Sequence, residues 1–166
     1  LGYDDEKITE PATSGDIAGQ NGLYTLLILN DRPERKRLVP GICDEEFRRD
    51  MKVPMTKKEI RVAAISSLEI RSGAVVYDIG SGTGSIAVEC AMLSPDIKVY
   101  AFECNEKAQK LLRENIERFG TANVYPVDGM APEVLDTEGL EPPTNVFIGG
   151  SKGQLEAIVE LSLIHI

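Results

Sequence analysis

Three glycines alternate with small residues in the stretch Tyr77-Asp78-Ile79-Gly80-Ser81-Gly82-Thr83-Gly84. The glycines follow an apolar run, 74–79, and precede a helix-forming run, 85–93. Glycine at a turn of this kind lets the backbone approach a ligand without a Cβ clash, and the start of a helix offers unpaired N–H groups. The dinucleotide fingerprint would require a further glycine at position 85, where serine stands, so the pattern is not that of a hydride-transfer enzyme.

The spacing D-x-G-x-G-x-G is instead typical of the nucleotide loop of S-adenosylmethionine (SAM) methyltransferases, which makes SAM the predicted cofactor. Glu103 supports an adenosine ligand, because it ends the next predicted strand, where an acid can accept hydrogen bonds from both ribose hydroxyls. NAD and SAM share this requirement. The alternatives are an ordinary tight turn for the glycines and a solvated strand end for Glu103.

Strands and helices alternate around this loop. Apolar runs predict strands at 74–79, 98–103, 123–127 and 145–148, and helical patterns predict helices at 85–93, 106–119 and 154–163. This alternation predicts βαβ units and a parallel sheet with right-handed crossovers. We therefore expect an α/β, Rossmann-like fold with strand order 3-2-1-4 and a ligand crevice at the carboxyl ends of the first and fourth strands.

The segment before the glycine loop predicts a short helix at 44–50 and a longer one beginning at Thr56. Thr56 and Glu59 have the spacing of a capping box, and Met55 and Ile60 occupy the positions of a hydrophobic staple. The expected apolar face of the longer helix consists of Ile60, Ala64 and Leu68. Further upstream, the apolar run 23–29 predicts a buried strand, and the charged, proline-bounded run 31–40 predicts a linker.

The composition excludes several classes of function. The chain has 166 residues, 42% of them hydrophobic, and a formal net charge of −9. No apolar run approaches the roughly 18 residues of a membrane span, and the acidic balance disfavours nucleic acid as a partner. Three cysteines without a CxxC pair indicate a reducing, cytoplasmic compartment, and a single histidine excludes a histidine-based metal site.

Several motifs resemble a known family, the decarboxylating precorrin-6Y C5,15-methyltransferases of cobalamin biosynthesis. The resemblance covers about residues 40–160 and is carried by PGICDEEF at 40–47, PMTKKEIR at 54–61, the glycine loop with its helix at 78–89, and FIGGS at 147–151. Glycine loops occur in all class I methyltransferases, whereas the second and fourth segments are far more specific.

The resemblance implies a class I methyltransferase fold, methylation of carbon 15 of a precorrin, and loss of the carboxyl group of the ring C acetate. The substrate would be a small tetrapyrrole, and the complete enzyme would be a homo-oligomer. The implied cofactor contacts are Gly80, Ser81, Gly82, Thr83 and Gly84 with the methionyl part, Glu103 with the ribose, Ala131 with the adenine, and Thr56 from the preceding helix. No catalytic residue is assigned, because a neutral thioether leaves without acid–base assistance.

Some residues carry open alternatives. Asp78 either holds the glycine loop or faces the methionine amine, and Asp128 either contacts the adenine or caps a turn. Met130 stands where the family has an acid, and Cys43 stands where it has proline. Six basic residues that could meet substrate carboxylates, or form a solvated helix face, are Arg48, Arg49, Lys52, Lys57, Lys58 and Arg61.

The resemblance also divides the chain. Residues 1–39 resemble the end of a tetrapyrrole methylase domain with a linker, and residues 40–166 form the methyltransferase domain, expected to be incomplete after its fourth strand and the following helix.

Two other interpretations of the function stay open. One is a class I methyltransferase acting on RNA or protein, although Gly149-Gly150-Ser151 stands where amino-directed enzymes carry Pro-Pro-aromatic. The other is a truncated fold without activity.

Overall fold

The computed structural model describes residues 40–165, so the predicted strand at 23–29, most of the linker and the methylase-like segment lie outside the described residues. The sheet contains four parallel strands in the order β3-β2-β1-β4. Their bounds are Val75–Ile79 for β1, Lys98–Glu103 for β2, Val124–Asp128 for β3 and Asn145–Ile148 for β4. The predicted fold class and strand order are confirmed.

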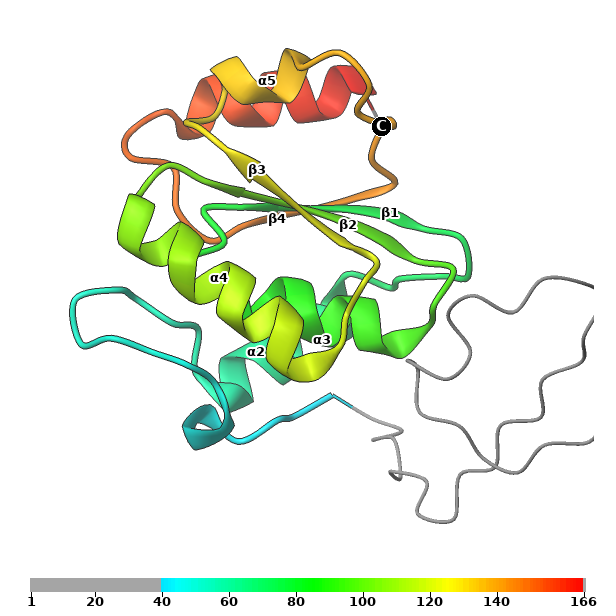
Figure 1. Ribbon diagram of the computed structural model, residues 1–166. Coiled ribbons are helices and arrows are strands. Elements are labelled where there is room, and N and C mark those ends of the chain that lie inside the picture. Colours follow the sequence, from blue (N-terminus) through cyan, green and yellow to red (C-terminus); the bar gives the residue numbers. More distant parts are fainter. Residues whose placement is uncertain (1–39, 166) are drawn as a thin grey trace, which may run out of the picture. The chain divides into compact units, whose positions relative to one another are not determined.

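Helices cover both faces of the sheet (Figure 1). The elements are α2 (Lys58–Ser67), α3 (Ser85–Leu93), α4 (Glu106–Phe119) and α5 (Leu155–His165), with short 3₁₀ helices η1 (Asp44–Glu46) and η2 (Glu133–Asp136). The helices α2, α3 and α4 lie on one face, and α5 lies on the other. Asn105 is the N-cap of α4, where its side chain accepts two backbone N–H groups, and Gly120 follows the last residue of the helix in the left-handed conformation.

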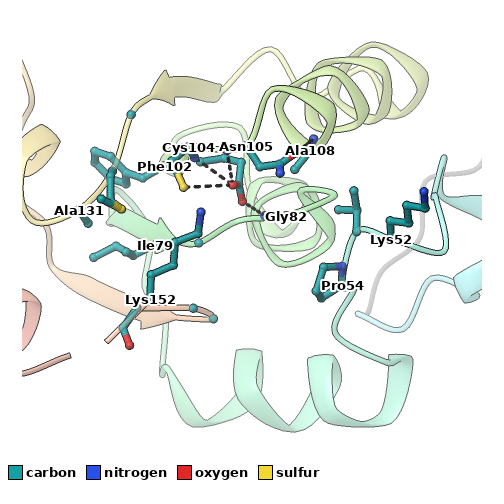
Figure 2. A pocket seen from close by; sticks show the side chains of 18 residues that line it. Lys52, Pro54, Ile79, Gly82, Phe102, Cys104, Asn105, Ala108, Ala131 and Lys152 are labelled. Carbon is teal, nitrogen blue, oxygen red and sulfur yellow. Dashed lines mark hydrogen bonds between the residues drawn. The ribbon is translucent and has the colours of Figure 1, made fainter. Parts of the chain in front are cut away.

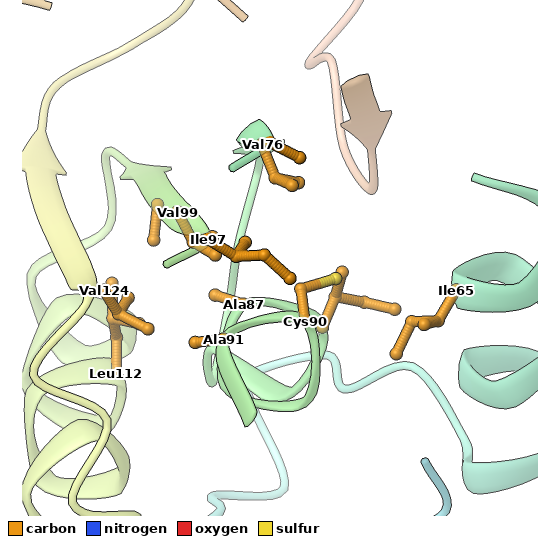
Figure 3. Packing of buried hydrophobic residues seen from close by; sticks show 12 residues of the cluster. Ile65, Val76, Ala87, Cys90, Ala91, Ile97, Val99, Leu112 and Val124 are labelled. Carbon is orange, nitrogen blue, oxygen red and sulfur yellow. The ribbon is translucent and has the colours of Figure 1, made fainter. Parts of the chain in front are cut away.

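The main core fills the space between the sheet and the three-helix layer (Figure 3). Val76 and Val99 are paired in register, and Val124 pairs with Val99 from the next strand. They pack against the small residues of α3, Ala87 and Cys90 among them. Alternate strand residues point to the opposite face, where the aromatic side chains of Tyr77, Tyr100, Phe102 and Tyr125 pack against one another.

The start of α2 differs from the prediction. The helix begins at Lys58 with Lys57 at the N-cap and without a side-chain cap, so the capping box of Thr56 and Glu59 is wrong. The staple is also wrong, because Ile60 is 63% exposed. The buried residues of α2 are Arg61 and Ile65, one position along from the predicted face. The reason is that a buried ion pair, described below, draws Arg61 inward and rotates Ile60 toward solvent.

The predicted helix at 44–50 is only the single turn η1. The chain from residue 41 to residue 54, which we call the strap, is largely irregular and runs along the helical layer. Ile42 and Phe47 of the strap are buried against Val88 of α3. The strap is therefore fixed by tertiary contacts rather than by its own secondary structure.

Candidate functional site

The glycine loop joins β1 to α3 at the carboxyl edge of the sheet. Gly80 and Gly82 have φ values of +73° and +58°, a region that side chains rarely adopt. A Cβ on Gly80 would lie 2.6 Å from the carbonyl oxygen of Gly150, and one on Gly82 would lie 2.8 Å from that of Pro54. The loop is thus packed between the β4 loop and the strap, and only glycine fits at either position.

Asp78 fixes the conformation of this loop through hydrogen bonds. Its carboxylate oxygen Oδ2 accepts a hydrogen bond from the Ser81 hydroxyl at 2.6 Å and one from the Ala87 N–H at 3.1 Å. Asp78 is buried, and its Oδ1 has no hydrogen-bond partner. Burial raises the pKa of Asp78 to about 6, an effect that the nearby Glu103 charge reinforces and the two hydrogen bonds oppose. Of the two alternatives for Asp78, the structure favours the one in which it holds the loop.

Glu103 connects the glycine loop to the end of β2. One carboxylate oxygen accepts the Gly82 N–H at 2.8 Å, and the other accepts the N–H groups of Cys104 and Asn105 at 2.9 and 2.8 Å. These bonds fix the carboxylate at the position that the sequence predicts for a ribose contact. The Cys104 thiol also donates weakly to Oε1 at 3.7 Å, whereas Oε2 accepts only the Gly82 N–H and therefore retains a lone pair for a hydroxyl donor.

A cavity of about 240 Å³ lies at this edge of the sheet (Figure 2). It is bounded by the ends of all four strands and by the strap, which is the switch point expected for an open α/β sheet. Its lining comprises Lys52, Val53, Pro54, Ile79, Gly80, Gly82, Phe102, Glu103, Cys104, Asn105, Ala108, Gly129, Met130, Ala131, Gly149, Gly150, Ser151 and Lys152. Apolar walls with a few polar groups suit a nucleoside ligand.

The structure brings four of the eight predicted cofactor residues to the cavity wall, namely Gly80, Gly82, Glu103 and Ala131. The other four, Thr56, Ser81, Thr83 and Gly84, are not among the lining residues. Ser81 points to Asp78, Thr83 is buried, and a Cβ on Gly84 would collide with Leu112 of α4. The carbonyl of Thr56 accepts a hydrogen bond from Arg61 at 2.6 Å, so this residue supports α2 through its backbone.

The β3 loop reaches the cavity through Gly129, Met130 and Ala131. Asp128 is not part of the wall, because Arg113 Nη2 donates to both of its carboxylate oxygens at 2.6 and 2.7 Å. The structure thus places Met130, and not Asp128, at the cavity wall.

Three buried side chains hold the strap over the cavity, and sequence reasoning missed this role for all of them. Arg61 donates from Nε to Glu89 Oε1 at 2.6 Å, and Glu89 accepts the N–H groups of Gly41 and Ile42 at 2.6 and 3.0 Å. Asn115 of α4 accepts the Arg48 N–H at 2.7 Å. The three side chains are 0–2% exposed. For Arg61 and Glu89, the signal available in the sequence was a charged residue within a helix that also carries apolar residues.

Arg61 is also the centre of a wider network. It contacts Asp44 Oδ1 at 3.2 Å and lies over the Phe47 ring, 4.8 Å from its centroid. Burial acts to raise the pKa of Asp44, but the hydrogen bond and charge of Arg61, together with Lys57, hold it below its ordinary value. The prediction that Arg61 meets substrate carboxylates is wrong, because its guanidinium is buried and its partners belong to the protein. Of the six basic residues, only Lys52 lines the cavity.

The β4 loop contributes Gly149 and Gly150, whose N–H groups both approach the Ile79 carbonyl oxygen, at 2.8 and 3.3 Å. The glycine pair thus allows two loops of the protein to pack closely. After it, Lys152 lines the cavity opposite Cys104. The Cys104 sulfur raises the pKa of Lys152, both as a hydrogen-bond acceptor and through its negative charge, and the charge of Glu103 adds to this.

Within residues 40–165, no cluster of potential ligands could hold a metal ion. None of the helices in the described part of the chain is long and apolar enough to cross a membrane.

Comparison with known proteins identifies similar sequences and structures. A family model described as a precorrin methyltransferase domain matches residues 45–163. A protein of Sulfolobus acidocaldarius named "Probable cobalt-precorrin-6B C(15)-methyltransferase (decarboxylating)" is 48% identical over 122 residues, which cover 73% of this chain and 62% of that relative. The chain thus spans less than two thirds of the length of this curated relative.

Two crystal structures have the same architecture. Precorrin-6y C5,15-methyltransferase from Geobacter metallireducens is 36% identical with a TM-score of 0.73, covering 80% of this chain and 68% of the other. The precorrin 8W decarboxylase of Methanobacterium thermoautotrophicum is 30% identical with a TM-score of 0.69, covering 75% of this chain and 66% of the other.

Proposed function

Because the chain belongs to the precorrin methyltransferase family, we propose that it binds SAM in the cavity and methylates carbon 15 of a precorrin, with loss of a carboxyl group. The observation that carries this proposal is the position of Glu103. Its carboxylate lies at the end of β2, lines the same cavity as Gly80 and Gly82, and accepts the Gly82 N–H. An acid and a glycine loop at this switch point are what an adenosyl ligand requires.

The lining fits the rest of such a ligand. Phe102, Ala108, Met130 and Ala131 give an apolar wall on the side of β2, β3 and α4, which suits an adenine ring. The glycine loop at the start of α3 lies on the opposite side of Glu103 and suits the methionyl part. Bound SAM would supply an activated methyl group on a sulfonium centre.

The contribution of the protein to such a reaction is orientation. The described part of the cavity wall holds no histidine, and methyl transfer to carbon with a neutral leaving group requires no general base from the protein. Holding two reactants in line can lower a barrier by about 7–11 kcal/mol. We assign this task to the rigid glycine loop, which Asp78 and Glu103 fix from two sides. Loss of the carboxyl group would use the macrocycle as the electron sink.

Isothermal titration calorimetry with S-adenosylhomocysteine tests the cofactor site. A methyl-transfer assay with a precorrin, followed by mass spectrometry for gain of a methyl group and loss of carbon dioxide, tests the reaction. Both should use the protein extended to the full length of its relatives. Failure to bind S-adenosylhomocysteine would refute the proposal, and binding with transfer to another acceptor would refute only the substrate.

The remaining expectations rest on the sequence and the family. We propose a homo-oligomer for the complete protein, a cytoplasmic location and no nucleic-acid partner. The acidic composition and the three cysteines without a CxxC pair support the last two. For the chain as a whole, we also propose that 1–39 is the end of a methylase-like domain and that 40–166 is the methyltransferase domain.

A further inference from the structure

The cavity wall carries more available positive charge than negative charge. Its charged side chains are Lys52, Glu103 and Lys152. Both oxygens of Glu103 already accept backbone N–H groups. In the described part of the chain, the ion pairs include neither Lys52 nor Lys152. In a chain with a net charge of −9, this local excess of positive charge favours an anionic group in the cavity.

Lys152 has an unusual backbone conformation. Its φ is +47°, in the left-handed region that side chains rarely adopt, and the following Gly153 has a φ of +87°. Strained conformations of non-glycine residues persist only where the surrounding structure maintains them, and they cluster at active and ligand-binding sites, although Glu69, with a φ of +49°, lies away from the cavity. The conformation places the lysine on the cavity wall, two residues after Gly150 of the β4 loop.

The Lys152 ammonium reaches from the β4 loop toward the β2 loop, as Figure 2 shows. There it lies near the Cys104 sulfur and the Glu103 carboxylate, and both groups raise the pKa of the ammonium. A cysteine sulfur is a weak hydrogen-bond acceptor, whereas a carboxylate gives the ammonium an oppositely charged acceptor and a short, strong hydrogen bond. A carboxylate entering the cavity would therefore be a stronger partner for the ammonium than the sulfur is.

We propose that Lys152 binds a carboxylate group of the molecule held in the cavity and thereby positions that molecule. This inference rests on the proposed function, which supplies two carboxylates: the one on the methionyl part of SAM, and those of the precorrin. The β4 loop borders the space next to the glycine loop, because Gly80 and Gly150 are in contact. Either carboxylate would therefore meet Lys152 near the reacting methyl group.

The test compares Lys152→Met, which keeps the length of the side chain but removes the charge, with Lys152→Arg, which keeps the charge. Lys98→Met is the matched control, since Lys98 lies at the other end of β2 and pairs with Glu141. Each variant of the full-length protein is titrated with S-adenosylhomocysteine and with methylthioadenosine, which has the nucleoside and thioether but no carboxylate. The KM for the precorrin is measured in parallel.

If the bound carboxylate belongs to the cofactor, Lys152→Met should weaken S-adenosylhomocysteine binding about tenfold or more and leave methylthioadenosine unchanged. If it belongs to the precorrin, the KM should rise by a similar factor with both titrations unchanged. In either case Lys152→Arg should restore most of the loss, and Lys98→Met should match the wild type.

Equal behaviour of Lys152→Met and wild type in all three measurements would overturn the inference, as would equal losses for the two nucleosides with KM unchanged. Failure of the arginine variant to recover any of the loss would show that the lysine acts through its shape and would also overturn it. A wild-type protein that binds neither nucleoside would refute the proposed function itself, and the ligand assigned to Lys152 with it.

Discussion

Replacing Arg61 by methionine should be among the most damaging single substitutions in the molecule. Arg61 is 0% exposed and Glu89 is 2% exposed, and their side chains meet at 2.6 Å. Removing one partner of a buried ion pair leaves the other charge uncompensated, which typically costs about 3–5 kcal/mol. Since whole domains are stable by only about 5–15 kcal/mol, Arg61→Met should come close to unfolding this one.

Arg61→Met should also weaken ligand binding in the cavity. Arg61 and Glu89 together anchor the strap through the carbonyl and N–H groups of Ile42. The far end of the strap supplies Lys52, Val53 and Pro54 to the cavity wall. We therefore expect S-adenosylhomocysteine to bind more weakly to Arg61→Met even under conditions in which the protein remains folded.

Urea unfolding of the full-length protein, followed by circular dichroism, measures the first effect. The double variant Arg61→Met/Glu89→Gln should lose less stability than the sum of the single variants, by about 1–3 kcal/mol, because the two side chains interact directly. Lys110→Met is the control, since Lys110 and Glu114 form an exposed pair at 3.9 Å, and it should change stability by less than about 0.5 kcal/mol. An Arg61→Met protein within about 1 kcal/mol of wild type would refute the reasoning.

Three further substitutions test the site. Glu103→Ala should weaken S-adenosylhomocysteine binding about tenfold to a hundredfold, because hydrogen bonds to a charged acceptor contribute about 1.5–3 kcal/mol, and an unchanged Kd by calorimetry would remove Glu103 from the site. Gly80→Ala should lower the thermal midpoint more than Gly139→Ala, since both positions have positive φ but only the first Cβ meets the backbone, that of Gly150; equal midpoints would contradict the packing. Burial raises the pKa of Asp78 from 3.8 to about 6, so the folded state binds a proton that the unfolded state loses, and the contribution of Asp78 to stability should fall as the pH rises through this window. Asp78→Asn should abolish that part of the pH dependence, and parallel stability–pH curves for variant and wild type would show that the shift is absent.

The features that the sequence predicted correctly depend on short-range patterns. Alternating runs give the helices and strands, and the right-handed crossover rule then leaves few strand orders to choose from. Glu103 could be placed opposite the glycine loop because parallel strands bring their carboxyl ends to one edge of the sheet. These inferences need only the local periodicity and the connectivity of βαβ units.

The sequence alone therefore determined the parallel α/β fold, the place of the cavity, and the residues Gly80, Gly82 and Glu103 at its wall. Only the tertiary structure decided that Arg61 is buried, that α2 begins at Lys58, and that the strap closes one side of the cavity. The physical reason is the separation along the sequence between the residues in contact. The partners Arg61 and Glu89 are 28 residues apart, and Arg48 and Asn115 are 67 apart, so neither pair leaves a periodic trace in the sequence. The free energy of such a contact depends on what surrounds both partners, and that is known only once the chain has folded.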